Sequence, residues 1–123
     1  MNARRELLIS ALALGIGAAG LAAAQSADAP IRIGFSMSRT GFLAQAMPDQ
    51  VNVYELWKDE VNARGGLDVG GGKRRRIDFV EYDNQSKPEL SVRIYEKLIT
   101  DDKVDLLLAP WGTPFHIAIA PIL

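Results

Sequence analysis

Three short apolar runs, each followed by a turn, set the strongest limit on what this chain can fold into. Residues 31–37 and 77–82 alternate apolar and polar side chains, as half-buried strands do. Residues 104–109 are almost continuously apolar, as in a strand covered on both faces. The segments between the runs are long enough for right-handed crossovers between parallel strands. This order predicts a β-α-β-α-β-α unit, an α/β fold with a parallel sheet and a shortened last helix.

Apolar residues at helical spacing occupy both gaps between the expected strands. The spacing predicts one helix over residues 48–64, stopped by a glycine cap at Gly65-Gly66. It predicts a second helix that ends near Asp101. Ser86 followed by Glu89 three residues later is typical of a capping box, so we expect Ser86 to be the N-cap of that second helix.

The first 24 residues have the three parts of a secretory signal peptide. Two arginines precede an apolar, uncharged stretch over residues 7–24, which ends in the small residues that a signal peptidase accepts. A membrane anchor is the alternative, because the stretch approaches spanning length. Both Sec and twin-arginine export fit the two arginines. We therefore expect a cleaved leader at 1–24, a polar tether at 25–30, one folded segment at 31–123, and a periplasmic product.

Composition argues against several classes of function. The chain has 14 basic and 15 acidic residues, so electrostatics give no reason to expect nucleic acid or an anionic membrane as a partner. It has no cysteine, which excludes thiol catalysis, thiolate metal sites and a lipid-modified cysteine anchor. The basic run at 73–76, beside three glycines, is interpreted as a flexible solvated loop, with a phosphate site as the alternative.

Patterns that would indicate catalysis or metal binding are weak. The stretch Gly15 to Gly20 matches the dinucleotide fingerprint G-x-G-x-x-G and is the basis of an alternative hypothesis, a nucleotide-dependent oxidoreductase. It lies inside the leader, so we interpret it as a chance match. The acidic residues at 101, 102 and 105 lack the spacing of a calcium loop, and the single histidine, His116, has no partner ligand nearby in sequence. We expect a non-catalytic protein without metal or cofactor.

Two loops that follow expected strands hold the candidate ligand-binding residues. Ser38 and Thr40 follow the first strand, and Trp111, Gly112 and Thr113 follow the third. Ligands of open α/β folds bind beyond the carboxyl ends of the strands. The later loop also opens a helix, with Thr113 as the expected N-cap, and helix N-termini suit a carboxylate. The alternative is ordinary capping by Thr113 and core packing by Trp111, and the residues alone leave both open.

Several segments, in order and at similar spacing, resemble the periplasmic branched-chain amino-acid-type (leucine-binding-like) substrate-binding proteins of ABC transporters. They span essentially the whole chain after the leader. These segments are Ile31-Arg32-Ile33-Gly34 with Thr40-Gly41, Val61-Asn62-Ala63-Arg64-Gly65-Gly66-Leu67, Glu81-Tyr82-Asp83-Asn84-Gln85-Ser86-Lys87-Pro88, Asp102-Lys103-Val104-Asp105 and Ala109-Pro110-Trp111-Gly112-Thr113.

The resemblance implies a type I periplasmic binding protein, in which two Rossmann-like lobes close on a ligand. Residues 31–123 would form the N-terminal part of lobe one. The loop after the third strand would hold a ligand carboxylate through backbone N–H groups and a hydroxyl, at Trp111, Gly112 and Thr113. The family often has a serine where this chain has Gly112, so only the backbone donor remains there. Ser38 and Thr40 would border the cleft.

On this resemblance we expect an extracytoplasmic receptor that captures a small carboxylate-bearing solute, such as an amino acid, and delivers it to an ABC permease. It would be a monomer, present here as an N-terminal fragment. A ligand-sensing domain of the same fold, without a transport role, is the alternative. The identity of the solute stays open, because the groups that usually hold a ligand amine would come from the rest of such a protein.

Overall fold

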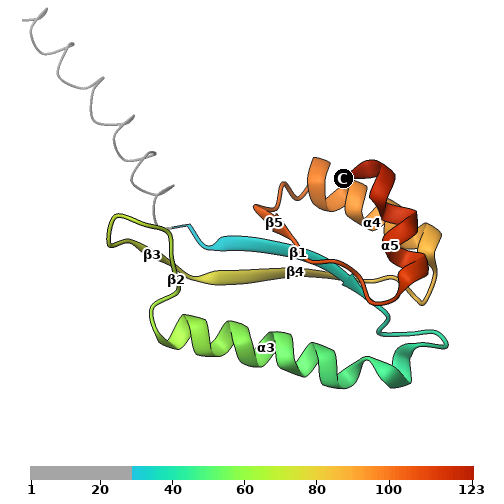
Figure 1. Ribbon diagram of the computed structural model, residues 1–123, viewed down its shortest axis with the longest axis horizontal. Coiled ribbons are helices and arrows are strands. Elements are labelled where there is room, and N and C mark those ends of the chain that lie inside the picture. The colour runs from blue at the N-terminus through green and yellow to red at the C-terminus, as the bar shows by residue number, and fades with distance from the viewer. Residues whose placement is uncertain (1–28) are drawn as a thin grey trace, which may run out of the picture.

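The computed structural model describes residues 29–123, which form a three-layer α/β unit. A parallel sheet lies in the middle, with helix α3 on one face and helices α4 and α5 on the other (Figure 1). No helix within residues 29–123 is long and apolar enough to cross a membrane. The elements are β1 (Ile31–Met37), η1 (Ala44–Ala46), α3 (Pro48–Ala63), β2 (Leu67–Asp68), β3 (Arg74–Arg75), β4 (Ile77–Asp83), α4 (Pro88–Thr100), β5 (Leu106–Leu107), α5 (Thr113–Ile119) and η2 (Ala120–Ile122).

Strand β1 is the centre of the sheet, whose strand order is β4-β1-β5. It pairs with β4 along its whole length, from Ile31 opposite Ile77 to Met37 opposite Asp83. The odd-numbered side chains of β1 are buried toward α3. On the other face, Gly34 leaves space for α4, because a Cβ there would lie 2.8 Å from Leu98. The predicted α/β fold with a parallel sheet is confirmed.

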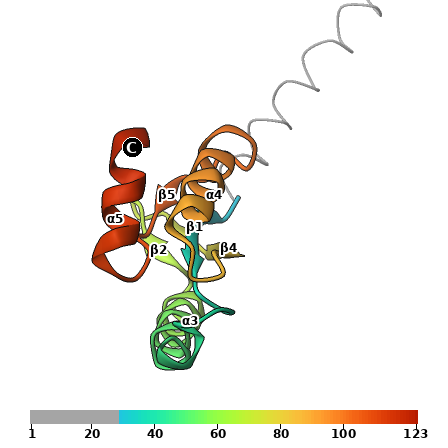
Figure 2. The same cartoon turned by 90° about the vertical axis from the view of Figure 1, so that its right-hand side faces the viewer.

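The third strand differs from the prediction of a buried strand over 104–109. Only Leu106 and Leu107 form β5, which pairs with β1 alone. Within the described part of the chain β5 is an edge strand, with β1 between it and β4 (Figure 2). The buried residues of α3 pack on β1 and β4, and Leu106 is 52% exposed. An unbroken apolar run predicts a strand well, but it does not show how many neighbours the strand has.

Helix α3 ends as the sequence predicts. The N–H of Gly65 donates to the carbonyl of Asn62 (3.1 Å) and the N–H of Gly66 to the carbonyl of Val61 (2.9 Å). These two bonds are those of a Schellman motif, which requires a residue at positive φ after the helix. Gly65 has a φ of +91°. The glycine pair therefore satisfies the last carbonyls of the helix and turns the chain back toward the sheet.

The Gly-rich basic segment is a small hairpin rather than a flexible loop. Strands β2 and β3 pair antiparallel, and the arginines of β3 bind backbone carbonyls. Arg74 donates to the carbonyl of Gly66 (3.0 Å), and Arg75 Nε donates to that of Ala29 (2.8 Å). Because these guanidinium groups fasten the hairpin to the chain around it, the run offers less to a phosphate than its charge alone indicates.

The predicted capping box at the start of α4 is wrong by one residue. Proline fixes its own φ near the helical value and pushes the preceding residue toward the extended region. Pro88 accordingly begins the helix, and Lys87, at φ −118° and ψ 113°, is the N-cap without a side-chain hydrogen bond. Ser86 lies one position too early to cap the helix, and its buried hydroxyl is used elsewhere.

Candidate functional site

The carboxyl ends of β4, β1 and β5 meet at one edge of the sheet, where three loops lie close in the fold (Figure 1). The chain passes from β1 through α3 to β4 on one side, and then through α4 to β5 on the other side of β1. Helices α3 and α5, which follow β1 and β5, therefore lie on opposite faces of the sheet. Such a topological switch point is where open α/β sheets bind ligands. It lies between the two loops that the sequence singled out.

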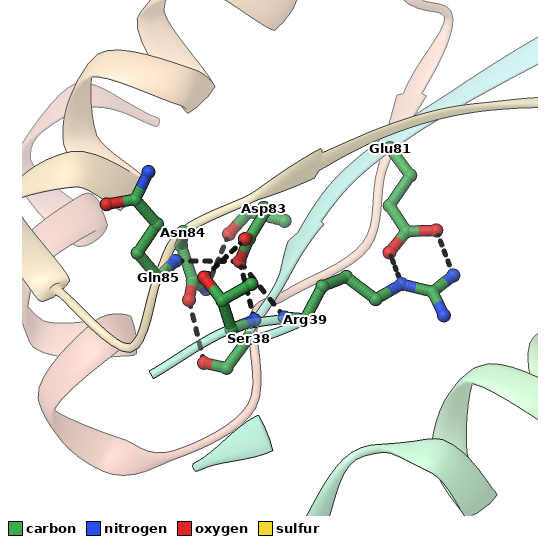
Figure 3. Close-up of polar contacts among 8 residues, drawn as sticks. Ser38, Arg39, Glu81, Asp83, Asn84 and Gln85 are labelled. Atoms are coloured by element: carbon green, nitrogen blue, oxygen red, sulfur yellow. Dashed lines mark hydrogen bonds and ion pairs between the residues drawn. The ribbon is translucent and has the colours of Figure 1, made fainter. Parts of the chain in front are cut away.

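Asp83, the last residue of β4, holds the loop that follows β1. Its Oδ1 accepts hydrogen bonds from the backbone N–H groups of Arg39 (3.0 Å), Thr40 (3.2 Å) and Gln85 (2.8 Å). Its Oδ2 accepts the hydroxyl of Thr40 at 2.6 Å. Figure 3 shows Asp83 beside Arg39 and Gln85. Desolvation by burial acts to raise the pKa of Asp83, but these hydrogen bonds outweigh it and lower the pKa below the usual range.

A buried network lies next to this carboxylate and joins three elements. The hydroxyl of Ser38 donates to Oδ1 of Asn84 at 2.7 Å, and Nδ2 of Asn84 donates to Oγ of Ser36 at 3.2 Å. Oγ of Ser36 lies 3.3 Å from Oγ of Ser91 on α4. All four residues are buried. Since every polar group finds a partner, the network fixes the end of β1 against β4 and α4.

Ser86 also joins the loop after β4 to the loop after β1. Its hydroxyl donates to the carbonyl of Thr40 (2.9 Å) and accepts the N–H of Leu43 (3.1 Å). Gly41 permits this close approach, since it has a φ of +87° and a Cβ on it would lie 2.5 Å from Oγ of Ser86. We call Asp83, Asn84 and Ser86 the β4-end clamp. The sequence predicted only a capping role for Ser86 and none for Asp83 or Asn84, although their position at and after a strand end could have indicated a role in this loop.

The predicted site residues of the first loop already have partners within the protein. Ser38 is buried, and Thr40 is exposed. Both donate their hydroxyl hydrogens to the β4-end clamp, so each oxygen keeps only acceptor capacity. Beside Ser38 and Arg39 lies a hollow of about 160 Å³, which also reaches Met47 and Val51. The guanidinium of Arg39 forms a two-point ion pair with Glu81, at 2.5 and 2.7 Å.

The second loop differs from the expected capping arrangement. Gly112, at φ +102° and ψ 138°, is the N-cap of α5, and Thr113 is the first helical residue. Thr113 therefore does not cap the helix as predicted, because it lies one position too late. Trp111 is 43% exposed, so it does not fill the core. Both parts of the capping-and-core alternative are thus contradicted.

Polar groups of this second loop are left available for a ligand. The side chain of Thr113 makes no hydrogen bond within residues 29–123. The N–H groups of Trp111, Gly112 and Thr113 likewise have no acceptor among the described residues. In contrast to the hydroxyls of the first loop, the hydroxyl of Thr113 in the second loop has no partner among residues 29–123. The arrangement suits an anionic or hydrogen-bond-accepting group.

The structure gives no support to the other hypotheses drawn from the sequence, within the residues that it describes. The leader, its glycine motif and the tether up to residue 28 lie outside the described residues. Within residues 29–123, no three His, Asp or Glu side chains gather as they would to hold a metal ion. The ring of His116 bonds the carbonyl of Pro110. Asp102 accepts bonds from Lys97 Nζ (2.8 Å) and the hydroxyl of Tyr82 (3.0 Å), so it has a structural role at the end of α4.

Comparison with known proteins shows which family shares this architecture. The family described as periplasmic binding protein matches residues 30–123. One similar crystal structure is that of the branched-chain amino acid transporter substrate-binding protein LivJ from Streptococcus pneumoniae, in complex with isoleucine. Its TM-score is 0.67, with 28% identity over 75% of this chain and 25% of that one. A solute-binding protein of an ABC transporter from Rhodopseudomonas palustris, in complex with 3,4-dihydroxybenzoic acid, has a TM-score of 0.61 and 26% identity, over 76% of this chain and 24% of that one. The chain thus spans about a quarter of the length of these structures.

Proposed function

The chain belongs to the periplasmic binding protein family, and on that premise we propose that it forms the N-terminal part of an extracytoplasmic receptor for a small carboxylate-bearing solute. The receptor would close two lobes around the solute and deliver it to an ABC permease, without catalysis. Its predicted leader would direct it to the periplasm, where it acts as a monomer. The solute would be an amino acid or a related compound.

One observation carries the proposal: the loop after β5 presents donors at the switch point of the sheet that have no acceptor within the described part of the chain. The N–H groups of Gly112 and Thr113 and the hydroxyl of Thr113, which have no partner among residues 29–123, would bind one carboxylate together. The exposed ring of Trp111 supplies an apolar wall beside them. A site with a few convergent polar groups next to an aromatic surface has the usual composition of a small-molecule site.

The ligands of the two related structures support a carboxylate as the common element. Isoleucine was bound to one and 3,4-dihydroxybenzoic acid to the other. Both molecules carry a carboxyl group, but only isoleucine carries an amine. A site held in common by such relatives would therefore recognise the carboxylate, and differences elsewhere would select the remainder of the solute. This reasoning favours the described loops as carboxylate site and leaves amine recognition to the second lobe.

The first loop would border the same site in a different role. Ser38 and Thr40 give their hydroxyl hydrogens to the clamp and keep oxygen lone pairs. We therefore assign them to shaping the wall and to accepting hydrogen bonds, rather than to holding the carboxylate. Thr113 remains the hydroxyl that would donate to the solute.

Calorimetric titration of the full-length receptor tests this proposal. We expect L-isoleucine or 3,4-dihydroxybenzoate to bind and isoleucinamide, which lacks the carboxylate, not to bind. Thr113→Val keeps the branched shape but removes the hydroxyl, and should weaken binding about ten- to a hundredfold, as for a lost hydrogen bond to a charged group. Equal affinity for isoleucine and its amide would contradict carboxylate recognition. Mass spectrometry of the exported protein should find its N-terminus near Gln25.

A further inference from the structure

We propose that His116 and Tyr95 are positioning residues, which hold the loop from Leu108 to Thr113 in the conformation that binds solute. The inference rests on the proposed function of this loop. Neither side chain would touch the solute. Each binds a backbone carbonyl of the loop from a different helix, His116 from α5 and Tyr95 from α4.

His116 closes the loop on itself by binding two of its carbonyls. Its backbone N–H donates to the carbonyl of Gly112 at 3.3 Å, in the first turn of α5, and the N–H of Phe115 donates to the same carbonyl at 3.1 Å. Its ring Nε2 binds the carbonyl of Pro110. A carbonyl only accepts, so Nε2 carries the hydrogen. The bond between the His116 ring and the carbonyl of Pro110 therefore closes the segment from Pro110 to His116 into a loop, and the side chain of Pro110 is buried.

Because the peptide bond is planar, these two bonds also set the direction of the N–H groups of Trp111 and Thr113. In a trans peptide, the carbonyl of one residue and the N–H of the next share a rigid plane and point in opposite directions. Holding the carbonyl of Pro110 therefore aims the N–H of Trp111 away from His116. Holding the carbonyl of Gly112 likewise aims the N–H of Thr113 away from the first turn of α5. Both of these N–H groups are free within the described part of the chain.

Tyr95 fixes the point at which the loop leaves the sheet. Its ring is fully buried in the cluster with Ile94, Leu98 and Ile119, and its hydroxyl donates to the carbonyl of Leu108. Burial raises the pKa of Tyr95 to about 12, so the hydroxyl keeps its hydrogen at any physiological pH. The backbone of Leu108 is held from the other side, because its N–H donates to the carbonyl of Gly34 at 2.9 Å.

The test compares three variants of the full-length protein. His116→Leu removes the ring donor, whereas His116→Gln keeps an N–H at the position of Nε2. Tyr95→Phe removes only the hydroxyl. We expect the Kd for L-isoleucine, or for 3,4-dihydroxybenzoate if that is the probe that binds, to rise about three- to tenfold in His116→Leu and Tyr95→Phe, the range for one neutral hydrogen bond. His116→Gln should bind within about twofold of the wild type, since it restores that bond. A merely structural role would lower the melting temperature without this difference between Leu and Gln.

A second readout does not depend on which solute binds. Acrylamide quenching of Trp111 is obtained as the difference between each protein and its Trp111→Phe counterpart. We expect quenching to increase in His116→Leu and to return to the wild-type level in His116→Gln. Wild-type quenching in His116→Leu, or a Gln variant as altered as the Leu variant, would overturn the inference. If neither probe binds the wild type, the carboxylate proposal for these probes fails, and the quenching experiment still decides the role of His116.

Discussion

Asp83 binds Thr40 twice, through the backbone N–H at 3.2 Å and through the side-chain hydroxyl at 2.6 Å. The two residues are far apart in sequence, yet their contact joins the ends of neighbouring strands. The loop after β1 therefore takes its shape in part from the end of β4, in addition to its own backbone bonds. This relationship leads to predictions that can be checked by measuring stability.

Asp83→Asn should destabilise the protein by about 1–2 kcal/mol, because an amide nitrogen does not accept hydrogen bonds and the charge that strengthened them is lost. The free energy of unfolding in urea measures this effect. Asp78→Asn is the matched control, since Asp78 lies on the same strand, is exposed and makes no side-chain hydrogen bond within residues 29–123. A loss as large in the control would show that the clamp is not the cause.

Stability should fall in acid, in part through Asp83. The hydrogen bonds around Asp83 make its folded-state pKa lower than its unfolded value. Its contribution is therefore complete above the ordinary aspartate pKa of about 3.9 and is lost as the pH falls through the folded-state value. The pKa of Asp102 is also lowered, chiefly by the hydrogen bond from Lys97. The difference in unfolding free energy between wild type and Asp83→Asn should therefore shrink below about pH 4, whereas a constant difference would speak against this linkage.

Gly112→Ser should lower the free energy of unfolding, although the family that the sequence resembles often has serine at this position. At φ +102° and ψ 138°, Gly112 adopts a conformation that costs other residues about 1–3 kcal/mol. The substitution should lower the free energy of unfolding by that amount or rearrange the loop and weaken solute binding. Ala109→Ser adds the same hydroxyl two peptide units before Trp111, where the backbone has no positive φ, and should be nearly neutral. Improved solute binding by Gly112→Ser would contradict the loop conformation described above.

Ser38 and Asn84 should show strong energetic coupling. Removing either partner leaves a buried polar group unsatisfied, so Ser38→Ala and Asn84→Ala should each cost about 1–3 kcal/mol. The double variant should cost less than the sum, with a coupling of at least about 0.5 kcal/mol. Unfolding of the four proteins of this double-mutant cycle measures the coupling. Additive costs would mean that the bond between the two residues contributes little.

The sequence predicts those features that depend on local patterns. Alternation located β1 and β4, and Gly65-Gly66 located the end of α3, because glycine at positive φ is a local requirement. Ser86 was misjudged because Pro88 decides where α4 begins and leaves the serine hydroxyl to the neighbouring loop. A serine three residues before a glutamate is a capping signal only if no proline sets a different start.

The candidate site was predictable in place but not in detail. Strand ends locate Ser38, Thr40 and Trp111 at one edge of the sheet. The hydroxyls of Ser38 and Thr40 donate to residues more than forty positions away, whereas that of Thr113 has no partner in the described segment. Periodicity carries no information on such contacts. The exposure of Leu106 could not be foreseen for the same reason, because it depends on which strand lies at the edge.

The pairing of Met37 with Asp83 also bears on how the sheet selects its alignment during folding. A slip of two residues between β1 and β4 would keep every side chain on its proper face, so apolar burial discriminates poorly against it. The same slip would carry Asp83 about 7 Å along the strand, beyond reach of the N–H groups of Arg39 and Thr40. The Asp83 carboxylate thus favours the native alignment, because a chain with the slipped register loses its hydrogen bonds from Arg39 and Thr40 together.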